Sequence, residues 1–180
     1  MALAVNTLPY GLRDVKIAPL QPDDSPGTFE DLPASQTMSF SESEEFTELR
    51  GDDKIIAIRG KGPKIEWELD AGGISFAAFN VLAGGTLTST GVTPAAVETL
   101  LKKVTDSRPY FWAEGQAISD SGGDFHVTLF RCRASSSIEG SLTDGEFWIT
   151  KATGDALGNA SDELYEFVHN ETAVDIDVGP

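Results

Sequence analysis

Apolar and polar side chains alternate most regularly between residues 64 and 70. Ile65, Trp67 and Leu69 occupy every second position, and charged residues fill the positions between them. Successive side chains of a β-strand point to opposite faces of its sheet. The pattern therefore predicts a strand with one buried face and one solvent-exposed face, which is largely acidic and carries Lys64, Glu66, Glu68 and Asp70.

Other segments carry weaker forms of this pattern. Glu42 and Glu44 interrupt the apolar face of a long segment at 36–50, which favours a β-bulge or an exposed end there. Glycine, aspartate and proline at 50–53, 60–63, 119–124 and 143–145 predict turns between strands. The predicted strands cover residues 14–20, 36–50, 54–59, 64–70, 110–118, 125–134 and 146–153, and a last apolar pattern follows at 164–168.

Helical spacing of apolar residues replaces the alternation in two places. Between residues 74 and 82 it predicts a helix that is apolar on most sides and packs against a sheet, with Gly84 and Gly85 at its end. Thr93 as the N-cap and Pro94 as the first helical residue precede a second helix-spaced set at 97–104. A strand would also fit this second set.

These elements predict a mainly β fold with a flanking α-helix, in which two antiparallel sheets pack as a sandwich or a partly closed barrel. The 180 residues suit one domain at 36–168, between an N-terminal arm at 1–35 with one short strand and a C-terminal arm at 169–180. The structural core is expected to include large apolar residues of the strands and the helix, namely Trp67, Ile74, Phe79, Leu82, Phe111 and Phe147.

The chain is strongly acidic, with a formal net charge of −16. Such a charge repels phosphate backbones, so tight DNA binding is not expected. Cys132 is the single cysteine and cannot form an intramolecular disulfide. Because neither a secretory leader nor an apolar run of about 20 residues is evident, we expect a soluble protein that is made in the cytoplasm and does not bind membranes.

The sequence offers little material for an active site. The two histidines and one cysteine cannot complete a zinc site. Ser121, Asp124 and His126 lack the sequence context of a catalytic triad. Glu66 and Glu68 share one strand face, whereas the carboxylates of a glycosidase flank a sugar from two sides. We therefore expect no catalytic residues, no cofactor and no bound metal.

Several strand and turn segments together resemble a known family. They are Glu-Leu-Arg-Gly-Asp at 48–52, Glu-Trp-Glu-Leu at 66–69 with Gly-Gly-Ile at 72–74, Arg-Pro-Tyr-Phe at 108–111, the segment 120–127, and Asp-Gly-Glu-Phe at 144–147. In order and spacing they are similar to the major tail proteins of long-tailed bacteriophages that infect actinobacteria, over residues 36–155.

This resemblance implies a structural subunit that assembles into stacked, hexameric rings. The rings would form the tail tube through which DNA passes without tight binding. The implied partners are other copies of the chain, the tape-measure protein, and the terminator and distal tail proteins. Assembly would take place in the host cytoplasm, and the product would reside in the virion tail.

An acidic lumen would suit the passage of DNA, because each cation facing it would form a phosphate contact that must be broken again. The lumen-facing candidates are Glu42, Glu44, Glu66, Glu68 and Asp70. Solvation of an outer wall explains these carboxylates equally well. An alternative function is a carbohydrate-binding or adhesive β-sandwich module, in which Trp67, Trp112 and Trp148 would stack on sugars.

Overall fold

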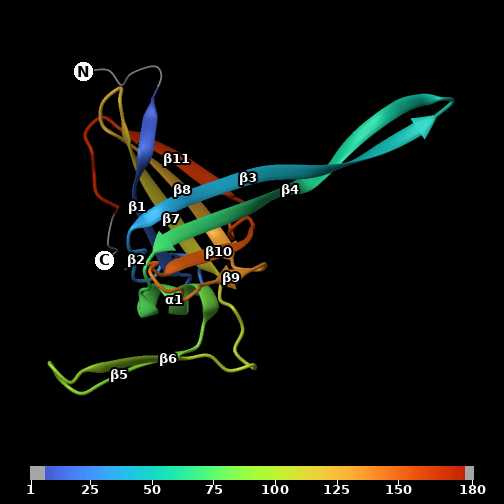
Figure 1. Ribbon diagram of the computed structural model, residues 1–180. Coiled ribbons are helices and arrows are strands. Elements are labelled where there is room, and N and C mark those ends of the chain that lie inside the picture. The colour runs from blue at the N-terminus through green and yellow to red at the C-terminus, as the bar shows by residue number, and fades with distance from the viewer. Residues whose placement is uncertain (1–6, 177–180) are drawn as a thin grey trace.

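A computed structural model describes residues 7–176 of the chain (Figure 1). It is mainly β, with antiparallel strands in two sheets and one helix in the described residues, so the predicted fold class is confirmed. The larger sheet is not a closed barrel and is organised like a sandwich. Its strands are β1 (Pro9–Pro19), β2 (Glu30–Asp31), β3 (Ser35–Gly51), β4 (Lys54–Gly72), β7 (Phe111–Ser119), β8 (Asp124–Arg133), β9 (Ile138–Glu139), β10 (Ile149–Ala156) and β11 (Tyr165–Asn170).

The larger sheet folds back on itself into two layers. Its strand order is β2-β1-β7-β8-β10-β4-β3, with β9 paired to β10. β8 pairs with β11 through Leu129 and the residues before it, but with β10 only through Cys132 and Arg133. The sheet divides at this fork, so that β3, β4 and β10 cross over β1, β7 and β8. Trp67 of β4 meets Phe111 of β7 edge-on between the layers, with ring centroids 5.3 Å apart.

The core lies between these layers and follows the alternation of β4. Ile65, Trp67 and Leu69 are buried, while the charged residues between them face outward, as the pattern predicts. β10 places Gly154 opposite Trp67, where an added Cβ would lie 2.8 Å from the tryptophan ring. A glycine at this position therefore makes room for the indole.

Helix α1 (Phe76–Ala83) covers one end of the core, close to the predicted range. Ser75 begins it as an N-cap by accepting a hydrogen bond from the Ala78 amide at 3.3 Å. Gly84 ends it with a positive φ, and an added Cβ there would lie 2.6 Å from the carbonyl oxygen of Ser107. The buried side of the helix consists of Ala78, Val81, Leu82 and Ala83.

Two of the expected core residues are not in the core. Trp67, Leu82 and Phe111 are buried and Phe79 is half-buried, but Ile74 and Phe147 are exposed, with 91% of Phe147 accessible. Ile74 precedes the helix and its N-cap, so the helical spacing does not apply to it. Phe147 lies in the irregular segment before β10, which begins three residues later than predicted. The alternation of β10 therefore does not govern Phe147.

The second predicted helix is wrong, and the alternative of a strand is correct. Residues 97–101 form strand β6 (Val97–Leu101), which pairs with β5 (Thr86–Thr90) in a separate two-stranded hairpin. Thr93 and Pro94 lie in the connection between the two strands. The strand forms because β5 pairs with it and supplies β-branched cross-strand neighbours. These are Thr86, Thr88 and Thr90, which the pattern of residues 97–104 alone does not reveal.

The predicted turn at residues 60–63 is also wrong. β4 runs through it, with Gly60 opposite Phe46 and Pro63 opposite Glu44. The extra residues are absorbed as a β-bulge, where the Glu44 carboxylate accepts a hydrogen bond from the Gly62 amide at 3.3 Å. The bulge lies opposite Glu44 of β3, where the sequence predicts a bulge or an exposed end. The predicted turn at 50–53 forms the tip of the hairpin.

Both segments expected to be arms contribute to the fold where the structure describes them. β1 pairs along β7 and places Val15, Ile17 and Ala18 in the core. At the other end, β11 continues to Asn170, and Ile176 is buried. The outermost residues of the two expected arms, 1–6 and 177–180, lie outside the described residues.

Candidate functional site

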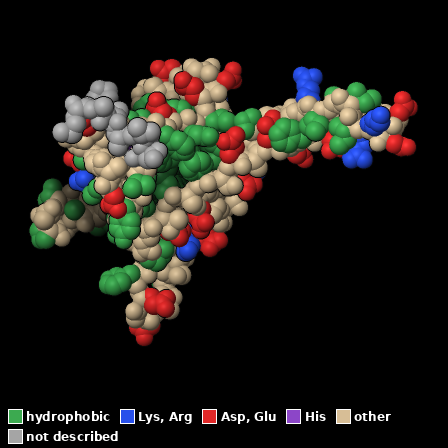
Figure 2. Space-filling view, turned by 90° about the horizontal axis from the view of Figure 1, so that it is seen from above, with side chains coloured by type: hydrophobic (Ala, Val, Ile, Leu, Met, Phe, Trp, Pro, Cys, Tyr) green, Lys and Arg blue, Asp and Glu red, His purple; other side chains and the backbone are tan. Residues whose placement is uncertain are grey.

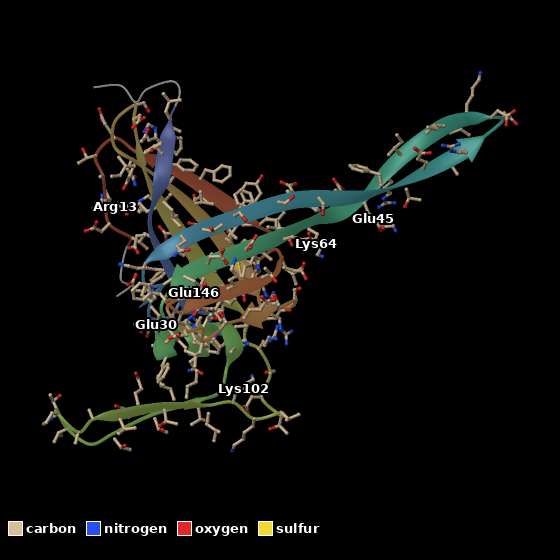
Figure 3. The ribbon with its side chains drawn as sticks, viewed as in Figure 1. Arg13, Glu30, Glu45, Lys64, Lys102 and Glu146 are labelled. Carbon is tan, nitrogen blue, oxygen red and sulfur yellow. The ribbon has the colours of Figure 1, made fainter. Side chains whose placement is uncertain are left out.

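The most prominent surface feature is the outer half of the β3–β4 hairpin. Beyond the bulge, residues 46–61 extend away from the two-layered body as a two-stranded ribbon (Figure 1). The part of β3 from Phe46 to Gly51 at the tip has six residues, which corresponds to a projection of about 20 Å. In Figure 3, Glu45 lies on the projecting part of the hairpin, where its two strands cross, and Lys64 lies nearer the body.

The ribbon carries large apolar side chains that no other part of the described chain covers. Figure 2 shows hydrophobic side chains along its length, with cations near its end. A two-stranded hairpin in water is only marginally stable, and large exposed apolar surfaces mark sites of interaction. The ribbon therefore has the properties of a segment that another surface covers. Its exposed large apolar residues are Phe46, Leu49, Ile55, Ile56 and Ile58.

These apolar residues occupy both faces of the ribbon. Residues paired across two strands share a face, so Phe46, Ile58 and Ile55 lie on the face of Glu48 and Arg50. The opposite face carries the apolar Leu49 and Ala57 between the cations Lys54 and Arg59. A second bulge leaves Ile56 without a partner, and its side chain reaches toward Gly51 on this opposite face.

The ribbon also differs in charge from the rest of the chain. Residues 46–61 contain four basic and three acidic side chains, within a chain whose net charge is −16. Arg50 pairs with Glu48 at 2.8 Å, and Lys61 pairs with Glu45 at 2.8 Å. Lys54 and Arg59 form no ion pair with any residue of the described range 7–176.

The β5–β6 hairpin is a second projecting element. It extends below the body in Figure 1 and is joined to it beside Lys102, labelled in Figure 3. The Lys102 ammonium donates hydrogen bonds to the carbonyl oxygens of Ala83 (2.5 Å) and Asp106 (2.9 Å), which holds the base of the hairpin to the end of α1. One face of the hairpin is uncharged and consists of Thr86, Thr88, Thr90, Val97, Thr99 and Leu101.

The five acidic candidates do not share one surface. Glu66, Glu68 and Asp70 lie on the outward face of β4, beside the serines of β3 and the polar residues of β10. Glu42 is paired with the buried Ile65 and Glu44 with Pro63, so both belong to the opposite face. Glu42 accepts a hydrogen bond from the Tyr165 hydroxyl at 3.0 Å, and Glu44 accepts one from the bulge.

The outward face of β3, β4 and β10, which we term the polar strip, also carries two lysines. Lys64 lies 2.8 Å from Asp155 and 3.2 Å from Glu66, and Lys151 lies 3.1 Å from Asp70. Glu68 forms no ion pair with a described residue. The strip encloses a shallow hollow of about 570 Å³, lined by Ser39, Ser41, Glu66, Glu68, Thr153 and Asp155 among others. Because of the two lysines, the polar strip is less acidic than the sequence of β4 alone suggests.

A buried polar cluster holds the last described segment against the sheet. The Asp124 carboxylate accepts hydrogen bonds from the Val174 amide (2.8 Å) and the Gln116 side chain (2.6 Å), and lies 3.0 Å from His126 Nε2. His126 Nδ1 lies 2.7 Å from Glu114. The sequence did not reveal this cluster. Its members alternate with apolar residues on β7 and β8, which is also the pattern of an ordinary strand with one solvent-exposed face.

The cluster shifts two pKa values in opposite directions. Burial alone would raise the pKa of Asp124, but the hydrogen bonds from Val174, His126 and Gln116 outweigh it and lower the pKa to about 2. Burial alone would lower the pKa of His126, but the hydrogen bonds with Glu114 and Asp124 raise it. The carboxylates of Glu114 and Asp124 therefore favour a protonated His126 between them, an arrangement that stabilises the fold.

The raised pKa of His126 predicts a pH dependence of stability. A folded-state pKa above the unfolded value of about 6.5 stabilises the fold fully below that pH, and the stabilisation is lost as the pH rises through the folded-state pKa. We expect the free energy of unfolding, measured in urea between pH 5.5 and 9, to fall with rising pH by less in His126→Asn than in the wild type. An unchanged slope in His126→Asn would contradict the assignment of this pH dependence to His126.

The triad considered from the sequence does not form. Ser121 bonds to the Ser119 hydroxyl at 2.7 Å, while both nitrogens of His126 are occupied by carboxylates. The three tryptophans also lie in different surroundings. Trp67 is buried, Trp112 packs edge-on against Phe130 with centroids 4.8 Å apart, and Trp148 donates to the Thr150 hydroxyl at 2.8 Å.

Fold and surface together define a mainly β protein with two projecting, partly apolar hairpins. No protein-family model matches the chain, and no curated protein is significantly similar to it. Within residues 7–176, no helix is long and apolar enough to cross a membrane. The same residues contain no group of three histidine, cysteine or acidic side chains placed to hold a metal ion.

Proposed function

We propose that this chain is a structural subunit that assembles with copies of itself, and that the assembly is the tail tube of a long-tailed bacteriophage. The observation that carries the proposal is the β3–β4 ribbon, which projects from the body and exposes five large apolar side chains. A ribbon of this kind is a poor structure for an isolated monomer but a suitable one for an assembled subunit. The chain would have no catalytic role.

The tube form of the assembly rests on the resemblance of residues 36–155 to major tail proteins. It implies hexameric rings that stack, with the tape-measure, terminator and distal tail proteins as further partners. The net charge of −16 supports a channel that DNA passes without binding tightly. Assembly would occur in the host cytoplasm, and the finished tube would be part of the virion tail.

Negative-stain electron microscopy and sedimentation velocity of the purified full chain test this proposal. We expect hollow rings or tubes whose amount increases with protein concentration. The control is a ribbon variant, Phe46→Thr with Ile58→Thr, which retains strand propensity but removes apolar surface and should remain monomeric. Monomers of the wild-type chain at every concentration, together with binding to a polysaccharide, would favour the carbohydrate-binding module instead.

A further inference from the structure

The two parts of β4 differ in how their side chains are distributed. Between residues 64 and 70 the strand alternates, with Ile65 and Trp67 buried and Glu66 and Glu68 exposed. Between residues 54 and 59 it reads Lys-Ile-Ile-Ala-Ile-Arg, an apolar run bounded by cations. Strands with such continuous apolar runs are typically buried on both faces, whereas strands with alternating polarity have one solvent-exposed face. The ribbon thus has the sequence of a two-sided core strand.

Nothing in the described chain covers either face of the ribbon. Leu49 on one face is 60% exposed and Ile58 on the other is 59% exposed, which is far from the burial of Trp67 on the same hairpin. A ribbon that lay flat on one partner surface would still leave the other apolar face in water. Covering both faces requires a surface on each side.

The charge of the ribbon indicates what those surfaces are. Lys54 and Arg59 have no ion-pair partner within residues 7–176, and residues 46–61 carry one more basic than acidic side chain. The whole acidic excess therefore lies in the remainder of the chain, so the body of another copy is a complementary surface. A basic or neutral partner would not offer this complementarity.

We propose that each ribbon inserts between two neighbouring copies of the chain, so that one copy covers the face of Phe46 and Ile58 and the other covers the face of Leu49. This inference rests on the proposed self-assembly and adds its geometry: every subunit binds two neighbours through one hairpin. Lys54 and Arg59 share the face of Leu49 and meet carboxylates of the copy that covers this face. The ribbon is ordered by insertion, as its marginal stability in water requires.

Fluorescent probes on the two faces test the insertion. Ile58→Cys and Leu49→Cys place a thiol on each face, and Cys132 does not compete for the dye because it is buried and burial raises the pKa of its thiol. A small fraction of chains labelled with a polarity-sensitive dye is mixed with excess wild-type protein. We expect both probes to shift to shorter wavelength as the wild-type concentration rises.

The outcomes separate the inference from the proposed function. Assembly visible by microscopy with only one probe shifted would overturn two-sided insertion and leave self-assembly intact. Shifts in dilute monomers would show that the chain covers its own ribbon, which also overturns the inference. A wild-type chain that never assembles contradicts both proposals.

Single substitutions give a second, label-free measurement. Leu49→Thr and Ile58→Thr are matched in exposure and lie on opposite faces. Each should raise the concentration needed for assembly about tenfold or more while leaving the circular dichroism of the monomer unchanged. If only one of the two variants has this effect, the ribbon lies on a single partner and the inference is wrong.

Discussion

Trp67→Ala should lower the free energy of unfolding by about 3–5 kcal/mol, which is the usual cost of removing a large buried aromatic side chain. Trp67 is only 3% exposed and stands edge-on to Phe111 between the two layers. Gly154 opposite it cannot fill the space that the indole leaves. Urea denaturation followed by circular dichroism measures the change, and soluble yield should fall with it.

Phe147→Ala is the matched control for this prediction. Phe147 is a large aromatic residue that the sequence also assigns to the core, but it is 91% exposed in the structure. Its removal should change the free energy of unfolding by less than about 0.5 kcal/mol. Equal effects of the two substitutions would contradict the described core. A stable Trp67→Ala variant that had lost binding to a sugar would support the carbohydrate-binding alternative.

Local alternation was sufficient to predict the sheet where one face is buried. The strand at 64–70, the irregular pairing beside Glu44 and the hairpin tip at 50–53 all follow from side-chain period and turn chemistry. Ser75 and Gly84 bracket α1 through hydrogen bonds between residues close in sequence, so this helix was also predictable. The signals were strongest where the residues that decide the structure are near one another in the chain.

Pairing between distant residues was not predictable in the same way. The glycines and proline at 60–63 are typical of a turn, but the facing residues Glu44 and Phe46 keep them in the strand. Residues 97–101 fit either a helix or a strand, and only pairing with β5 decides between them. The polar cluster of Asp124 and His126 depends on the Val174 backbone, which no local pattern around β8 reveals.

The candidate site illustrates the same limit at the level of assembly. The run at 54–59 was predicted as a strand, but its sequence does not say that it lies outside the body. Its one indication was the absence of alternation, which marks a strand covered on both faces. The acidic candidates of β3 and β4 lie on opposite faces of the sheet. Glu42 and Glu44 alternate along β3 with serines, and it is these serines that lie beside Glu66 and Glu68.

The polar strip leads to a prediction about the proposed tube. Stacked rings would repeat any inward-facing charge along the channel, and salt screens such a field beyond roughly 8 Å. Glu66 and Glu68 are exposed on the strip, where Lys64 already lies beside Glu66. Replacing both glutamates by lysine would leave the strip rich in cations that bind phosphate. Because both side chains point away from the core, the fold of the subunit should be unaffected.

In phage particles whose tubes contain Glu66→Lys with Glu68→Lys, we expect DNA ejection to be slowed or blocked, most strongly at low salt, because each new cation forms phosphate contacts that must be broken as DNA moves. Asp144→Lys with Glu146→Lys makes the same charge change on the exposed segment before β10 and serves as the control. The ejection rate at several ionic strengths is the measurement, with microscopy confirming normal tails. Wild-type rates for the strip variant at every ionic strength would show that the strip does not face the DNA and instead solvates the outer wall.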